Sequence, residues 1–374
     1  MKTYLRTFAI ALLGMFIVMG MFSYVLDPYA VFGVESVSGL NERKTAAADK
    51  GRMIKSYQVV QQQPQVLLVG NSRIEIGLPK THQFYRGPVF NLGLPGASVM
   101  MQYDYAWHAI KSTKSVREIV IAIDFVDFLS VGSSEKPPVN GSWQTRLHYT
   151  LSTDSVSVTR NDVQLKEQLS FLLSKSAIED TFLTLVQQRW EVNALDATGF
   201  NDGLLYHHVV RAEGFAALYQ QKQQELNTRL ANPKLRLDTQ SNEFRVFSLF
   251  LQRLANEGVE VSLFINPYHY PYLDVIANNG LGDEFKKWKE WVADIAIHFQ
   301  IPLYDFSIQS PLVMQPLVTP SRNIDDNQWF WEPAHYRRAF GTLILDVLTQ
   351  KNCLISVEGR KILICEQLSV APSQ

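Results

Sequence analysis

The chain has 374 residues, enough for one large domain or two ordinary ones. Hydrophobic residues make up 46% of the chain and charged residues 19%, a composition that excludes an intrinsically disordered protein. The formal net charge is −1, from 35 basic and 36 acidic side chains without a long basic run. A nucleic-acid-binding role therefore has no electrostatic support.

An uncharged apolar stretch of 19 residues, 8–26, follows Lys2 and Arg6. As a helix it would be about 28 Å long, close to the thickness of a bilayer core. A cleaved signal peptide is the alternative, but its apolar core is usually shorter and ends at a small-x-small site. We therefore predict an uncleaved single-pass anchor in the inner membrane. The positive charges predict that tail 1–7 is cytoplasmic and that the chain after Asp27 is periplasmic.

Residues 27–63 are polar and irregularly patterned, and we predict a stalk with helical character. Beyond them, short apolar runs stopped by glycine or polar residues predict buried parallel strands. These runs are Val66–Gly70, Pro88–Gly93, Glu118–Asp124, Glu260–Asn266 and Ile301–Phe306.

Segments with helical periodicity alternate with the strands, at Val99–Lys111, Phe244–Asn256, Phe285–Phe299 and Ala334–Leu348. This alternation predicts an α/β domain over residues 64–350, a three-layer α/β/α sandwich around a five-stranded parallel sheet. Sites in such folds lie beyond the carboxyl ends of the strands. The alternation is interrupted at about 130–242, where a turn-rich loop and helices near 162–191 and 211–230 predict a helical cap.

Two cysteines, Cys353 and Cys365, lie in the C-terminal segment 351–374, symmetrically about Glu358-Gly359. Their spacing predicts a β-hairpin followed by a tail. A disulfide in an oxidising compartment and two unpaired thiols both fit this pattern. The spacing does not match a zinc site, and we expect neither a metal nor a cofactor.

Ser72 directly follows the first predicted strand, in the sequence GNSRIEIG. A serine on a tight turn after a buried strand is held at the carboxyl edge of the sheet, where helix N–H groups favour developing negative charge. Serine is also a common turn and N-cap residue, so this position by itself fits a structural role as well.

The sequence EPAHY holds Glu332 and His335 just before the last predicted helix. Pro333 suits the first helical position, which would place the carboxylate and the imidazole on one helix face. The carboxylate would then orient one ring nitrogen while the other takes a proton from a serine. The alternative is a carboxylate that complements the helix dipole beside a packing histidine. After the second strand, Gly93 and Gly96 allow close backbone approach to an oxyanion, or simply form a turn.

Taken in order, these blocks resemble the SGNH (GDSL-like) hydrolase superfamily, whose fold is flavodoxin-like. Ser72 takes the place of the family's serine, and Asn71 stands where aspartate is usual. Gly96 matches the oxyanion-hole glycine, and His335 matches the catalytic histidine. Glu332 stands where the family usually has aspartate.

The resemblance covers roughly residues 66–348 outside the insertion, with one departure in the third block. The family supplies an oxyanion-hole asparagine there, whereas this chain has Asp124 and Asp127. A carboxylate would repel an oxyanion, so Asn71 and Asn266 are the candidate substitutes.

The anchor and the insertion make the chain similar to periplasmic proteins of alginate acetylation and to the D-alanine transfer protein of teichoic acid modification. Such proteins work beside membrane-bound O-acyltransferases. The resemblance implies that Ser72 accepts an acyl group, acetyl in the first branch, and passes it to a polysaccharide hydroxyl or removes it. A non-catalytic, glycan-binding or assembly protein of the same fold is the alternative. The residues assigned to substrate binding are Arg73, Trp329, Trp331, His269 and Asp124.

Overall fold

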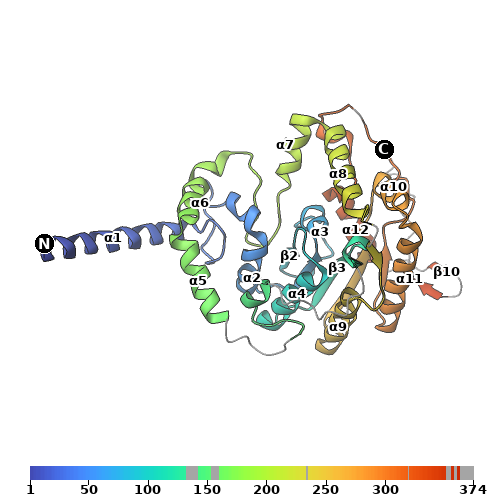
Figure 1. Ribbon diagram of the computed structural model, residues 1–374, viewed down its shortest axis with the longest axis horizontal. Coiled ribbons are helices and arrows are strands. Elements are labelled where there is room, and N and C mark those ends of the chain that lie inside the picture. Colours follow the sequence, from blue (N-terminus) through green and yellow to red (C-terminus); the bar gives the residue numbers. More distant parts are fainter. Residues whose placement is uncertain are drawn as a thin grey trace.

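The structure is a computed structural model that describes residues 1–131, 142–152, 160–232, 235–318, 320–350, 355–357 and 360–362. A five-stranded parallel sheet with the strand order β2-β1-β3-β6-β7 lies at its centre (Figure 1). The α/β class and the five parallel strands predicted from the sequence are confirmed. The strands are β1 (Val66–Gly70), β2 (Val89–Gly93), β3 (Glu118–Ile123), β6 (Glu260–Ile265) and β7 (Leu303–Asp305).

Apolar side chains on both faces of the sheet are buried, which explains why the strands read as continuous apolar runs. Leu67 and Val69 of β1 belong to a cluster shared with α4 (Val99–Thr113), α9 (Asn242–Glu257) and α11 (Gly282–His298). Their neighbours Val66 and Leu68 belong to a second cluster with α3 (Ser72–Gly77) and α12 (Arg338–Gln350). The alternation follows from the period of two in a strand.

The order of the strands places a crevice beyond the end of β1. The chain leaves β1 to form β2 on one side and then returns to form β3 on the other. At such a switch point the connections diverge, and ligands bind outside the carboxyl ends of the strands. Ser72 begins α3 at this point.

Helix α1 (Lys2–Leu26) projects from the body and is exposed over most of its length (Figure 1). Its length and apolar composition fit a membrane anchor or a signal sequence. The following residues do not form a free stalk, which differs from the prediction for 27–63. Tyr29 and Ile54 are buried in a cluster with the insertion, and Val59 joins the main core. The amphipathic helix α2 (Gly51–Gln62) and the 3₁₀ helix η1 (Thr45–Lys50) bury these apolar side chains against the domain.

The insertion is closed at its base by a two-stranded antiparallel pair, β4 (Leu129–Val131) with β5 (Leu235–Leu237). Between these strands, the described helices are η3 (Ser142–Arg146), α5 (Arg160–Leu173), α6 (Lys175–Val186), η4 (Gln187–Arg189), α7 (Leu204–Glu213) and α8 (Phe215–Leu230). The insertion is therefore helical, as predicted. Outside it lie η2 (Phe125–Phe128), α10 (Tyr270–Asn278) and η5 (Ile324–Asp326).

The C-terminal segment contains an antiparallel pair, β10 (Ile355–Val357) with β11 (Arg360–Ile362), on either side of residues 358–359. This is the position predicted for the hairpin. Cys353 and Cys365 lie outside the described residues, so the choice between a disulfide and free thiols remains as the sequence leaves it.

Candidate active site

Ser72 is fixed by the turn that joins β1 to α3. Asn71 caps this helix, because its side-chain Oδ1 accepts a hydrogen bond of 3.0 Å from the main-chain N–H of Arg73. The helix lies tightly on the end of β2. A Cβ added to Gly93 would lie 2.6 Å from the main-chain nitrogen of Glu75, so only glycine fits there. The serine therefore sits, half-buried, on a tightly packed corner.

Glu332 and His335 lie in a short β-hairpin rather than in a helical turn. The hairpin pairs β8 (Phe330–Glu332) with β9 (His335–Tyr336), and Glu332 is the partner of His335 in the register. Helix α12 starts only at Arg338, so the helix start predicted at residue 334 is wrong. Pro333 fits a tight turn as well as a first helical position, which is why the sequence pattern was ambiguous.

Ser72, His335 and Glu332 form a continuous hydrogen-bonded chain. The Oγ atom of Ser72 lies 2.7 Å from Nε2 of His335, and Nδ1 of His335 contacts Oε1 of Glu332. Glu332 is completely buried, and its Oε2 accepts a hydrogen bond of 2.6 Å from the main-chain N–H of Ala334. These contacts favour the tautomer in which Nδ1–H donates to Glu332 and Nε2 accepts from the serine hydroxyl.

The carboxyl group of Glu332 stays ionised in this arrangement. Burial raises the pKa of Glu332. The charge and hydrogen bond of His335 and the N–H of Ala334 lower this pKa by more than burial raises it, so the net shift is downward. An ionised carboxylate beside Nδ1 stabilises a positive imidazole. His335 can therefore take the proton of Ser72.

A cavity of about 170 Å³ opens beside the serine and the histidine. It is small compared with ordinary ligand pockets of about 300–1,000 Å³. Helix α8 of the insertion contributes one wall, with Lys222, Glu225, Leu226 and Arg229. The other lining residues are Asn71, Ser72, Arg73, Gly96, Asp127, Tyr272, Ala334 and His335. Sequence reasoning missed the α8 residues, because nothing in their local pattern shows where an insertion folds back.

Two main-chain N–H groups at the cavity, those of Ser72 and Gly96, are candidate oxyanion donors. Gly96 lines the cavity with a left-handed φ of +61°. In the part of the chain that the structure describes, neither its N–H nor that of Ser72 donates to another group. The side-chain amide of Asn71 is already engaged, since Nδ2 donates to Asp124 at 2.5 Å and to Asp127 at 3.0 Å. Asn266 is buried, and its Nδ2 donates to Asp124 at 2.9 Å.

Asp124 is a buried hub beneath the site and does not line the cavity. Besides the two asparagines, it accepts a hydrogen bond of 2.7 Å from Tyr268 and pairs with Arg73 at 2.8 Å. The guanidinium of Arg73 also donates through Nε to the carbonyl oxygen of Ala334, at 2.7 Å. Arg73 therefore ties the end of β3 to the hairpin that carries His335. It also balances the negative charge of the buried Asp124 carboxylate.

Asp127 lies at the wall of the cavity, close to Asp124. Burial and the charge of Asp124 raise the pKa of Asp127 to about 6, against hydrogen bonding from Asn71 and the charge of Arg73. Nδ2 of Asn71 and Nε2 of Gln102 donate to its Oδ2 atom. This carboxyl group titrates far above an ordinary aspartate.

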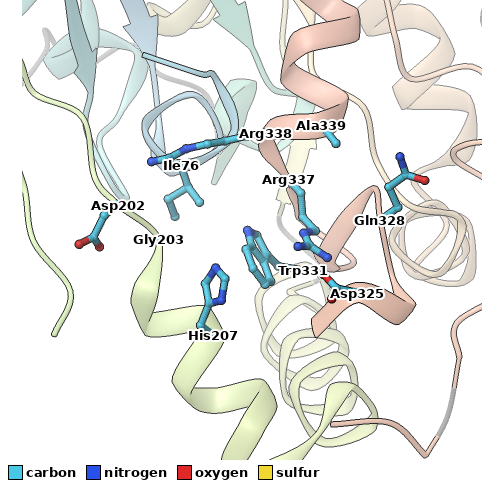
Figure 2. A pocket seen from close by; sticks show the side chains of 10 residues that line it. All are labelled: Ile76, Asp202, Gly203, His207, Asp325, Gln328, Trp331, Arg337, Arg338 and Ala339. Atoms are coloured by element: carbon cyan, nitrogen blue, oxygen red, sulfur yellow. The ribbon is translucent and has the colours of Figure 1, made fainter. Parts of the chain in front are cut away.

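A second cavity, of about 230 Å³, is lined by His207 and Trp331 among other residues (Figure 2). Tyr206 of α7 stacks on Trp331, and its ring centroid lies 5.6 Å from that of His335. Figure 2 shows Trp331, Arg337 and His207 gathered around the same space, with the Arg337 guanidinium 4.3 Å from the centre of the Trp331 ring. The Trp331 ring, 5% exposed between Tyr206 and Arg337, thus lies next to the triad.

The residues assigned to substrate binding are spread over different places. Arg73 lines the first cavity and Trp331 the second. Trp329 packs against Phe340, and His269 is buried with its Nε2 atom 2.8 Å from the carbonyl oxygen of Gln315. Neither of these two lines a cavity beside the triad.

No family model matches the chain, and no curated protein matches it. The geometry of the site therefore carries the functional assignment. Among the described residues, no group of three histidine, cysteine, aspartate or glutamate side chains is placed to hold a metal ion.

Proposed function

We propose that this chain is a serine-dependent enzyme that transfers an acyl group to a polysaccharide outside the cytoplasm, or removes one from it. The observation that carries this proposal is the hydrogen-bonded chain from Ser72 through His335 to Glu332. A nucleophile, a base and an orienting carboxylate in contact constitute the arrangement required for covalent acyl transfer.

The reaction has two halves. His335 Nε2 takes the proton of Ser72, whose Oγ attacks the carbonyl carbon of the donor, and the N–H groups of Ser72 and Gly96 stabilise the oxyanion. The bond to the leaving group then breaks, and the leaving group takes the proton from His335. In the second half, a glycan hydroxyl gives its proton to His335 and attacks the carbonyl carbon of the acyl–Ser72 ester. The bond between that carbon and Ser72 Oγ then breaks, and Oγ takes the proton back from His335. With water as acceptor the same steps amount to ester hydrolysis.

The cavities support a small acyl group and a sugar acceptor. A volume of about 170 Å³ beside Ser72 favours an acetyl group over a long acyl chain. The neighbouring cavity is lined by Asp325, Gln328 and Arg338, whose polar side chains can exchange hydrogen bonds with sugar hydroxyl groups. We assign this cavity to the polysaccharide.

The SGNH superfamily is the family that we propose. The serine after β1, Gly96 after β2 and the late Glu332 and His335 follow its order. Helices in contact with both faces of the sheet support its three-layer, flavodoxin-like fold. A non-catalytic member would be favoured by a bare carboxylate at Asp124, but Arg73 pairs with it.

We further propose that α1 is retained as an inner-membrane anchor with the domain in the periplasm. The last turn of α1 is part of the folded body. Ser23 accepts a hydrogen bond of 3.1 Å from Thr181, and the main-chain oxygen of Leu26 accepts one of 2.9 Å from buried Lys44. Cleavage after this turn would remove those contacts. A membrane-bound O-acyltransferase is the partner that would deliver the acyl group.

Labelling with a fluorophosphonate probe tests the catalytic proposal. The full chain in detergent should be labelled, Ser72→Ala should not, and Ser38→Ala, which removes an exposed serine outside both cavities, should be labelled like wild type. Equal labelling of Ser72→Ala and wild type would exclude Ser72 as the nucleophile. A glycan acceptor with an aryl acetate donor then distinguishes transfer from hydrolysis.

A further inference from the structure

Helices α5 and α6 hold the end of α1 between them. Leu173 of α5 packs on Gly20, where an added Cβ would lie 3.2 Å from its side chain. On α6, Phe182 contacts Phe22 with ring centroids 5.3 Å apart, and Thr181 hydrogen-bonds to Ser23. In Figure 1 the two helices lie on either side of the base of α1, with their axes running across it.

These contacts lie within the apolar stretch of α1 and not beyond its end. Residues 20–23 precede Leu26 by three to six positions, or about 5–9 Å along the helix. Amphipathic helices that lie in a membrane surface are buried by a similar depth of about 5–10 Å. If the apolar stretch spans the bilayer, α5 and α6 therefore reach its outer boundary.

Both helices expose apolar side chains at helical spacing. Leu165 and Leu169 of α5 are 59% and 49% exposed, and Phe182 and Val186 of α6 are 49% and 55% exposed. Trp190, one turn beyond Val186, is 56% exposed. Each pair is four residues apart and so lies on one face of its helix.

The opposite faces of the same helices are bound to the protein. Phe171 of α5 and Ala177 of α6 are buried in the cluster that also contains Tyr29 and Ile54. Each helix thus has one stripe in the body and one apolar stripe left uncovered. Apolar stripes of this kind mark an interaction surface in a folded protein.

We propose that the outer leaflet of the bilayer covers this surface, so that α5 and α6 lie at the boundary between headgroups and acyl chains around the base of α1. The inference rests on the proposed anchor. Both helices contact α1 at residues 20–23, inside its apolar stretch, and this favours lipid over a second protein as the occupant. Seated in this way, the domain is held at a fixed tilt, and its catalytic cavities keep a constant orientation relative to the membrane.

Quenching by brominated lipids tests this placement in the full chain. Cys353 and Cys365 are first changed to serine. Leu169→Cys and Val186→Cys are then made separately in this background, and each variant is labelled with bimane and placed in vesicles of phosphatidylethanolamine and phosphatidylglycerol. Both labels should lose roughly half of their fluorescence when the acyl chains are brominated, because they lie about 5–10 Å inside the boundary. A label on Lys287, an exposed residue of α11, should not be quenched, because this helix lies on the opposite side of the body from α1 (Figure 1).

A label on Leu12 within α1 separates the two ways in which the inference can fail. If Leu12 is quenched while Leu169 and Val186 behave like Lys287, the anchor holds and the seating of α5 and α6 is wrong. If Leu12 is not quenched, the anchor and the inference fail together. Fluorophosphonate labelling of Ser72 in the same vesicles reports on catalysis independently of either result.

Discussion

At the scale of single residues, the site depends on a carboxylate that holds one imidazole in one orientation. Glu332 uses both oxygens, one on Nδ1 of His335 and one on the N–H of Ala334. Its pKa is lowered despite complete burial, so it is ionised at neutral pH. The contact between Glu332 and His335 was predicted from the sequence, and the structure contains it. The sequence could not specify the hairpin, because Pro333 suits both a turn and a helix start.

The substitution Glu332→Gln tests this role directly. The amide can keep the hydrogen bond from Ala334 but would favour the wrong imidazole tautomer, so kcat should fall on the order of 10⁴-fold. Esterase activity on an aryl acetate measures the loss, and thermal unfolding checks that the fold is intact. Wild-type kcat in a folded variant would show that Glu332 does not orient the base.

At the scale of elements, one ion pair joins the loops that carry the site. Arg73 at the start of α3 pairs with Asp124 after β3 and donates to Ala334 in the β8–β9 hairpin. The Arg73 side chain is 8% exposed and that of Asp124 is 1% exposed, so a lone charge in either place would be poorly solvated. Arg73 was assigned to substrate binding, but its contacts make it a positioning residue as well.

Arg73→Met should therefore destabilise the protein by about 3–5 kcal/mol, because it leaves the Asp124 carboxylate buried without its partner. The double variant Arg73→Met/Asp124→Asn should recover much of that loss. Urea unfolding measures the free energies of the set. A single variant as stable as wild type, or a double variant no better than the single, would contradict a buried ion pair between these elements.

The elements themselves were largely readable from the sequence. The run VLLVG gave β1 with its bounds, since a strand buried on both faces is apolar throughout. For the segment before β1 the sequence predicted a stalk. Helix α2 is mostly polar, and the single apolar face that it buries against the domain is not evident from its composition. The cavity wall formed by residues of α8, from Lys222 to Arg229, could not be predicted from the sequence, because it depends on how the insertion packs against the rest of the domain.

At the scale of the whole molecule, a buried histidine makes the free energy of unfolding depend on pH. His269 is 2% exposed, and burial lowers its pKa from 6.5 to about 4, against its hydrogen bond to Gln315 and the charge of Glu332. In the unfolded chain His269 binds a proton below about pH 6.5, whereas in the folded protein it binds one only below about pH 4. Stability is therefore full above pH 6.5 and is lost as the pH falls towards 4.

The variant His269→Gln removes this titration while it keeps a donor towards Gln315. Between pH 6.5 and pH 4, wild type should lose up to about 3 kcal/mol more unfolding free energy than the variant. The comparison cancels other groups, including Asp127, whose raised pKa acts with the opposite sign between its ordinary value and about 6. Parallel stability curves for the two proteins would rule out His269 as the cause.

The whole molecule also combines a projecting apolar helix, α1, with a candidate active site in the folded body. The catalytic proposal and the membrane proposal stand on different residues, Ser72 with His335 in one case and α1 with α5 and α6 in the other. Either can fail without the other.

The most direct test of the central claim is the mass of the peptide that contains Ser72 after brief incubation with an aryl acetate and an acid quench. Ser72 should carry an acetyl group in the wild-type protein, this group should be missing from Ser72→Ala, and it should be discharged when a glycan acceptor is added. A folded wild-type protein that turns over the ester without acetyl on Ser72, or that acetylates another residue instead, would contradict this claim.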